Sequence, residues 1–178
     1  GLICLCMREV TIMLYLVAGD GLKKDVFDPK NGKMYLCVID FEELKTAGDT
    51  FGISDKFIYE CQRSGVSKFE SHDGFDFLSL NVPDDTDQRK PPQRVCIYFT
   101  NTLLLFVCNN NQVVNDTISE LAEEGLKSIN LSKVLHLFLD RLTFDDALVL
   151  EDIEQDISEL EESLMMSQKS DMIDDIVA

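Results

Sequence analysis

The sequence predicts an α/β protein in which a mixed β-sheet is flanked by helices and followed by a long, acidic C-terminal helix. Three features lead to this prediction. Short runs rich in β-branched and aromatic residues recur up to residue 108 and are typical of strands. After Asn109–Asn111 the apolar residues return every three or four positions, as on one face of a helix. Acidic residues then concentrate near the C-terminus, where residues 140–178 hold 13 acidic and 2 basic residues.

The first two strands are expected at residues 8–17 and 33–40, in the stretches "REVTIMLYLV" and "KMYLCVID". Their β-branched and aromatic side chains pack well on a pleated surface. Residues 19–32 between them contain Gly, Asp, Pro and an Asn-Gly pair, which favour turns. We therefore expect a loop between these strands.

Two short helices are expected next. Asp40 and Glu43 have the spacing of a capping box, whose side chains satisfy free backbone N–H groups where a helix begins. Gly52 is expected to end this helix, because glycine readily adopts the left-handed conformation found there. Ser54 can cap a second helix over residues 55–63.

Four more strands are expected at 66–71, 75–83, 94–99 and 102–108. Asp73-Gly74 joins the first two, and this dipeptide is a strong signal for a hairpin. Thr100-Asn101 is an equally short connection between the last two. The polar stretch "PDDTDQRKPPQ" (83–93) between the two pairs bears prolines, which do not fit a central strand.

Two helices are expected in the C-terminal third. The first covers residues 112–125, and Gly125 is expected to end it. One of its faces carries apolar residues: Val114, Ile118, Leu121 and Ala122. Residues 131–166 contain neither Gly nor Pro. They predict one long helix of about 50 Å at 1.5 Å per residue.

The chain is accordingly divided into an α/β domain at 1–130, the long helix at 131–166 and a tail at 167–178. Within the long helix, residues 151–164 carry seven carboxylates and no basic residue. Their apolar residues form a stripe that can pack on the domain or on another helix: Ile153, Ile157, Leu160 and Leu164.

Composition excludes several classes of protein. The formal net charge is −17, which opposes binding to nucleic acids or to anionic membrane surfaces and suits cations or basic partners. The six cysteines show no C-x-x-C spacing, and most lie in apolar runs, which indicates core residues in a reducing, cytosolic environment. The apolar N-terminus is interrupted by Arg8 and Glu9, so we expect neither a membrane span nor a signal peptide.

No convincing catalytic centre is present in the sequence. Cys61, His72 and Asp73 are residue types used in nucleophilic catalysis. However, His72 and Asp73 lie at a predicted hairpin tip, and Cys61 lies in a helix that ends before the hairpin begins. No Gly-rich phosphate loop, G-x-S-x-G or H-E-x-x-H motif occurs. We therefore expect a protein that is not an enzyme and has no organic cofactor.

The order of these pieces resembles the N-terminal cytosolic domain of the CorA-type magnesium transporters. Four stretches and the long helix carry the resemblance: "CVIDFEEL" (37–44), "FGISDKFIYE" (51–60), "GVSKFESHDGFDFLSLNVP" (65–83), "RVCIYFTNTLLLFVC" (94–108) and the acidic helical run at 137–164. The similarity covers roughly residues 8–166. It departs from the family pattern at Ser54-Asp55, where the family has His-Pro, and the chain ends before any transmembrane span or Gly-Met-Asn signature.

The resemblance implies an α/β/α sandwich on the cytoplasmic side of the cell membrane. It also implies a homo-oligomer, a pentamer in the full-length family, that transports Mg²⁺ and is gated by Mg²⁺ bound to carboxylates between subunits. The family's sensing carboxylate falls on Glu60. Membrane contact would come only through segments missing from this chain.

The acidic helix supplies further candidate metal ligands, namely Glu159, Glu161 and Glu162. Mg²⁺ prefers oxygen ligands and retains its water, so a few carboxylates can hold it without a fixed motif. A bound cation would relieve their mutual repulsion. Two alternatives stay open: a zinc-transporting member of the same superfamily, and a free-standing acidic protein-interaction module.

Overall fold

The structure is a computed structural model, and it describes residues 13–18, 21–24, 28, 30, 32–63, 65, 67–83, 87, 89–123, 129–142, 155, 158 and 162. Within these residues seven strands form one mixed sheet, in the order β2-β1-β3-β7-β6-β5-β4. The strands are β1 Met13–Ala18, β2 Gly21–Lys24, β3 Met34–Ile39, β4 Lys68–His72, β5 Phe75–Val82, β6 Gln93–Phe99 and β7 Leu103–Val107. The central β3 and β7 run parallel, and the other neighbouring strands are antiparallel.

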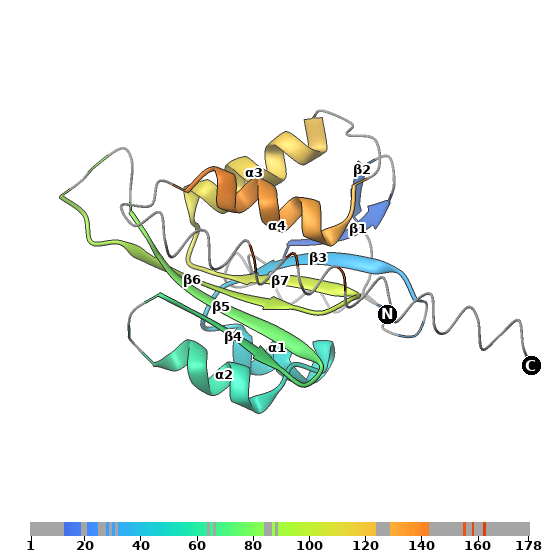
Figure 1. Ribbon diagram of the computed structural model, residues 1–178, viewed down its shortest axis with the longest axis horizontal. Coiled ribbons are helices and arrows are strands. Elements are labelled where there is room, and N and C mark those ends of the chain that lie inside the picture. The colour runs from blue at the N-terminus through green and yellow to red at the C-terminus, as the bar shows by residue number, and fades with distance from the viewer. Residues whose placement is uncertain are drawn as a thin grey trace, which may run out of the picture.

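Helices cover both faces of the sheet (Figure 1). One layer consists of α1 (Leu44–Phe51) and α2 (Asp55–Gln62), and the other of α3 (Gln112–Glu123) and α4 (Leu131–Asp140). This arrangement confirms the predicted α/β/α sandwich. It arises because the central strands are apolar on both faces, so both faces need a cover.

Each face of the sheet has its own hydrophobic core. Under α1 and α2 the core includes Phe57 and Phe77, whose rings meet edge to face at 5.4 Å. Under α3 and α4 it includes Phe106 and Phe138, whose rings meet at 5.0 Å. Successive residues of a strand point to opposite faces, so neighbours such as Leu105 and Phe106 belong to different cores.

Several local signals act as the sequence predicts. The Asp40 carboxylate accepts the Glu43 N–H at 2.8 Å, as a capping box predicts, whereas Glu43 is itself the N-cap residue of α1 and its side chain makes no capping bond. Gly52 follows α1 with a φ of 65°, in the left-handed region. The Ser54 hydroxyl accepts the Lys56 N–H at 3.2 Å and caps α2. Gly74, with a φ of 85°, lies in the tight turn between β4 and β5.

Two local predictions are wrong. Residues 21–24 were expected to lie in a loop but form β2, which pairs with β1 in an antiparallel hairpin and occupies one edge of the described sheet. A turn-forming residue such as Gly21 therefore does not exclude a strand, because it can begin the second strand of a hairpin. On α3, Val114, Ile118 and Leu121 are buried as predicted. Ala122 is exposed, and Thr117 completes the buried stripe in its place.

The predicted helix over 131–166 is not continuous in the structure. The helix α4 ends at Asp140, and Arg141 and Leu142 follow in a turn whose N–H groups bond three residues back, to Phe138 and Leu139. Such tight terminal bonds are typical of a helix end. Beyond residue 142 the structure describes Gln155, Ser158 and Glu162, each helical, so the acidic helix itself and the tail lie largely outside the described residues, as does Gly125.

All four described cysteines are buried free thiols. Cys37, Cys61, Cys96 and Cys108 are free and buried, as the apolar runs around them predict. Burial raises the pKa of Cys37 to about 12 and that of Cys108 to about 11, which is typical of thiols that serve as small core residues. Cys4 and Cys6 lie outside the described residues.

Candidate functional site at the α2–β4 edge

The helix α2 holds Glu60 against the sheet. Phe57 anchors the helix through its contacts with Phe77 and with the Tyr98 ring, at 5.0 Å between centroids. Glu60 and Cys61 follow three and four positions later, so they share the face that Phe57 buries. Glu60 is consequently only 9% exposed, which is unusual for a glutamate unless it has a charged partner.

The partner comes from β4, the strand at the other edge of the described sheet. Lys68, Glu70 and His72 alternate along this strand, so their side chains point to one face. That face is the one covered by α1 and α2, because Glu70 pairs with Phe77, which belongs to the core under α2. A row of three polar side chains thus lies beside the buried face of α2.

Glu60, Lys68 and Glu70 form a compact ion-pair group. The Lys68 ammonium donates to Glu60 Oε2 at 2.6 Å and to Glu70 Oε1 at 3.2 Å. Arg63, one turn along α2, lies 3.8 Å from Glu60 Oε1. The Arg94 guanidinium reaches the Glu60 backbone carbonyl at 3.5 Å. The Glu60 carboxylate therefore already has two cationic neighbours.

His72 extends the group along β4. Its Nε2 lies 2.9 Å from Glu70 Oε2, and its Nδ1 lies 3.3 Å from the Lys56 ammonium. A lysine ammonium can only donate, so Nδ1 must accept and Nε2 must carry the proton. His72 thus links Lys56 on α2 to Glu70 on β4.

The pKa shifts in this group follow from its contacts. The hydrogen bond to Glu60 is the main cause that raises the pKa of Lys68, so the ammonium stays charged at neutral pH. Partial burial alone would raise the pKa of Glu70, but Lys68 and His72 together outweigh it and hold that pKa below its ordinary value. The contacts therefore favour the charged forms of Lys68 and Glu70.

The predicted metal ligands are not brought together within the described residues. Glu60 is buried in the ion-pair group, whereas Glu162 is exposed on a helical segment. Glu159 and Glu161 lie outside the described residues. Among the residues that the structure describes, no group of three or more His, Cys, Asp or Glu side chains could hold a metal ion. The ligand set therefore stays a prediction.

The rejected catalytic arrangement does not assemble. Cys61 hydrogen-bonds to Cys96, and this bond together with burial raises the pKa of the Cys61 thiol far above its ordinary range. The same contact and the nearby Arg94 lower the pKa of Cys96. His72 is engaged by Glu70 and Lys56 instead of a thiol. Cys61 thus lacks the adjacent base that an activated nucleophile needs.

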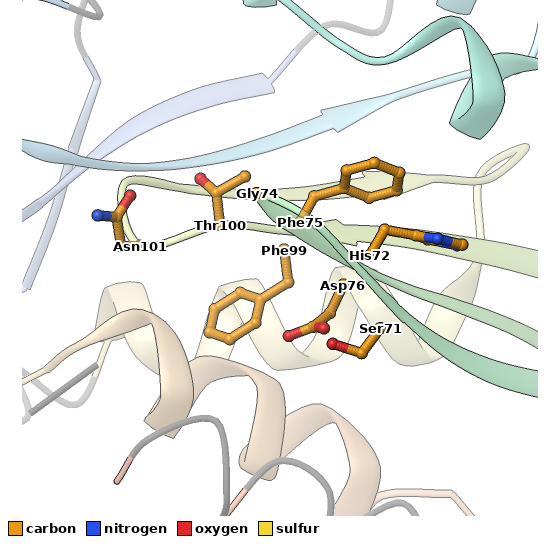
Figure 2. Close-up of a pocket in the computed structure, with 8 residues that line it drawn as sticks. All are labelled: Ser71, His72, Gly74, Phe75, Asp76, Phe99, Thr100 and Asn101. Atoms are coloured by element: carbon orange, nitrogen blue, oxygen red, sulfur yellow. The ribbon is translucent and has the colours of Figure 1, made fainter. Parts of the chain in front are cut away.

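A pocket of about 280 Å³ lies next to this group, at the end of the sheet where the turns after β4 and β6 meet. Figure 2 shows Ser71, Asp76 and Phe99 pointing to one side of the sheet and His72 and Phe75 to the other. The register explains this, since Ser71 and Phe99 both pair with Asp76, and His72 pairs with Phe75. The residues that line the pocket therefore come from both faces of the sheet at its end, and their polar side chains do not converge on one point.

Lys68 is the site residue that sequence reasoning missed. The strand predicted over 66–71 is confirmed as β4, Lys68–His72. Lys68, Glu70 and His72 recur with the period of two that places side chains on one face, which is a signal available in the sequence. The distance between the Lys68 ammonium and the Glu60 carboxylate could not be predicted from the sequence, because it depends on how α2 packs against the sheet.

Comparison with known families now decides the relationship. A family profile described as "CorA-like Mg2+ transporter protein" matches residues 40–178. This chain belongs to that CorA-like family. The matched region includes both α2 and the acidic C-terminal segment. No curated protein matches the chain.

Solved structures share the fold of this CorA-like chain. The ZntB cytoplasmic domain from Vibrio parahaemolyticus superposes with a TM-score of 0.61 at 14% identity, over 83% of this chain and 63% of that one. Full-length CmaX superposes with a TM-score of 0.61 at 13% sequence identity, over 88% of this chain and 50% of that one. The soluble domain of CorA from Methanocaldococcus jannaschii superposes with a TM-score of 0.56 at 16% sequence identity, over 90% of this chain and 66% of that one. At such identities the similarity shows the fold alone.

The chain spans between half and two thirds of the length of these three solved chains. In the part of this CorA-like chain that the structure describes, none of the helices has the length and apolar character that crossing a bilayer requires.

Proposed function

We propose that this chain is the cytoplasmic regulatory domain of a CorA-like divalent-cation transporter that carries Mg²⁺. The match of the family profile to residues 40–178 is the observation that carries the proposal. The α/β/α sandwich, which the soluble domain of an archaeal CorA shares, supports it. Under this proposal the chain is not an enzyme, and Mg²⁺ is both the transported ion and the regulatory ligand.

The transported ion would cross the membrane through other parts of the complete gene product. The proposal predicts two apolar stretches of about 20 residues each after Ala178 in the gene. It also predicts a homo-oligomer, a pentamer by resemblance to the family. A stop codon directly after Ala178 would contradict it and favour the free-standing acidic interaction module.

Regulation would act through carboxylates that repel one another when no cation is bound. Glu159, Glu161 and Glu162 are the proposed ligands in the acidic segment, and Glu60 is the proposed ligand on α2. Mg²⁺ keeps several of its waters, and these complete its octahedral coordination, so it can bridge carboxylates from neighbouring subunits without a fixed set of protein ligands. A fall in Mg²⁺ would then let the acidic segments separate, because like charges in proximity repel.

The test is ion flux through the complete gene product reconstituted in liposomes. We expect Mg²⁺ uptake that falls when Mg²⁺ is present on the side that faces this domain. Replacing Glu159, Glu161 and Glu162 with glutamine should weaken that inhibition and leave uptake itself intact. Unchanged inhibition in the triple variant would contradict the proposed ligands, and absence of any divalent-cation flux would contradict the transporter function.

Zinc transport is the second candidate, because the ZntB cytoplasmic domain shares this fold as the archaeal CorA soluble domain does. The same liposomes distinguish the two ions. Zn²⁺ flux that persists with excess Mg²⁺ present would favour the zinc transporter, and Mg²⁺ flux would favour the first candidate.

A further inference from the structure

The Lys68 ammonium lies between two carboxylates, where a bound cation would otherwise be expected. It is 2.6 Å from Glu60 Oε2 and 3.2 Å from Glu70 Oε1. Two carboxylates that converge on one point would repel each other strongly if nothing positive lay between them. Glu60 was predicted as a metal ligand, but its carboxylate is already neutralised by a residue of the same chain.

The surrounding structure fixes this ammonium in place. Lys68 belongs to a strand of the sheet, and its register opposite Ser79 determines the face to which its side chain points. Its ammonium also lies 5.3 Å from the centre of the Phe77 ring, a distance at which a cation is attracted to an aromatic face. The side chain is 31% exposed, well below the exposure of a lysine on an open surface.

The formal charges around Glu60 are balanced without a metal. Glu60 and Glu70 contribute two negative charges, and Lys68 and Arg63 contribute two positive charges. A divalent cation added beside Lys68 would face an ammonium at close range. It would have to displace Lys68 and break two charge-assisted hydrogen bonds, which are among the stronger contacts in proteins.

We propose that Lys68 is a built-in cation of this site, which takes the position of a regulatory metal ion at Glu60 and keeps α2 joined to β4 at every Mg²⁺ concentration. The inference rests on the proposed function, since only a cation-regulated transporter gives reason to expect a metal at Glu60. It refines that function in one respect. Glu60 is then not one of the residues that bind regulatory Mg²⁺. The response to Mg²⁺ arises in the acidic segment that contains Glu159, Glu161 and Glu162.

The first test is Mg²⁺-dependent thermal denaturation of the full 178-residue chain at constant ionic strength. The wild type and Glu60→Gln should show the same change in Tm with millimolar Mg²⁺. Lys68→Met removes the ammonium that the two carboxylates share and should gain an additional Mg²⁺-dependent rise in Tm. The double variant Glu60→Gln/Lys68→Met is the matched control and should lose that gain, whereas Lys68→Arg, which keeps the charge, should behave as the wild type.

A second measurement needs no variant and covers the case in which Lys68→Met fails to fold. Mn²⁺ is a paramagnetic ion that accepts the same oxygen ligands as Mg²⁺ and broadens NMR signals of nearby nuclei. In the wild-type chain the amide signals of Glu60, Lys68 and Glu70 should keep their intensity when substoichiometric Mn²⁺ is added. Selective loss of these three signals would overturn the proposal.

The outcomes separate this inference from the proposed function. If Glu60→Gln abolishes the Mg²⁺ response of the wild type, or Lys68→Met folds and gains none, the role assigned to Lys68 is wrong. Neither result bears on whether the complete gene product transports a divalent cation, which the liposome flux measures. Conversely, a protein without flux could still show the Lys68-dependent metal response.

Discussion

Replacing Glu43 with glutamine is expected to stabilise the protein at neutral pH. Glu43 precedes α1, and its Oε2 atom is buried without a hydrogen-bond partner. Desolvation is the main cause that raises the pKa of its carboxyl group, and the charges of Asp40 and Glu42 raise it further. The carboxylate is therefore an unfavourable group in the folded protein at pH 7.

The magnitude follows from three opposing effects. Glutamine leaves a neutral polar atom in the same buried place, so the substitution removes only the additional cost of the charge, about 1 kcal/mol of the roughly 1–3 kcal/mol that a buried group without a partner costs. Each nearby like charge adds about 0.2–0.5 kcal/mol. Against this, a negative charge at a helix N-terminus is favourable by about 0.3–1 kcal/mol. Glu43 as a whole is only partly buried, so the low end of each range applies. We expect a net gain of about 1 kcal/mol for Glu43→Gln, or a Tm about 2–4 °C higher.

The pH dependence has a definite sign. The folded-state pKa of Glu43 is raised, so its carboxylate costs stability above that pKa, and the wild type recovers the loss as the pH falls through it. Glu70 is the opposite case, because its folded-state pKa is lowered. Its carboxylate contributes stability above the unfolded-state pKa and loses it as the pH falls through the folded-state value. Glu70→Gln should therefore destabilise at pH 7, by about 0.5 kcal/mol for a side chain this exposed.

Urea denaturation of the wild type, Glu43→Gln and Glu70→Gln from neutral to acidic pH measures both effects. At pH 7 the two variants should lie on opposite sides of the wild type. All three free energies of unfolding should converge in the acid range, where the carboxyl groups are protonated. A Glu43→Gln variant that is less stable than the wild type at pH 7 would show that the helix-start charge outweighs desolvation and repulsion.

Three further variants test the packing and the helix ends, each by the same denaturation. Phe138→Ala removes a fully buried ring that contacts Phe106 and should cost about 3–5 kcal/mol, whereas Leu137→Ala, on a half-buried neighbour, should cost clearly less. Asn130→Ala removes the side chain that accepts the Lys133 N–H at 2.8 Å at the start of α4, and should cost about 1 kcal/mol. Gly52→Ala forces a Cβ into the left-handed region and should cost about 1 kcal/mol, although nothing lies within 4 Å of the new atom.

The local signals in the sequence were sufficient for much of the fold. Ser54 and Gly52 bound the short helices because capping and left-handed backbone depend on adjacent residues only. The hairpin at Gly74 follows for the same reason. The end of α4 was missed because Arg141 and Leu142 are compatible with a helix, and the burial of Leu142 against the core is decided by tertiary packing.

The candidate site was predictable only in part. The sequence places Glu60 on a helix and Lys68 on a strand, but their contact joins residues whose distance depends on the packing of Phe57 against Phe77. Period-two alternation predicts that Lys68 and Glu70 share a face, and no sequence pattern predicts that α2 covers that face. The carboxylate chosen from resemblance, Glu60, therefore lies on α2 as expected and has a partner that the sequence did not predict, and its role as a metal ligand stays a prediction.

The ion pairs at the α2–β4 edge leave the acidic segment at residues 140–178 as the main concentration of negative charge that a cation could bind. Glu60 and Glu70 already contact Lys68 and Arg63, so this site has little to gain from an added cation. Residues 140–178 hold 13 acidic and 2 basic residues, the largest concentration of like charge in the chain. Monovalent salt screens exposed charges without binding them, whereas a divalent ion bridges two carboxylates at once. A response of the whole chain to Mg²⁺ that an equal ionic strength of NaCl does not reproduce, and that replacing Glu159, Glu161 and Glu162 with glutamine abolishes, would therefore arise in the acidic segment.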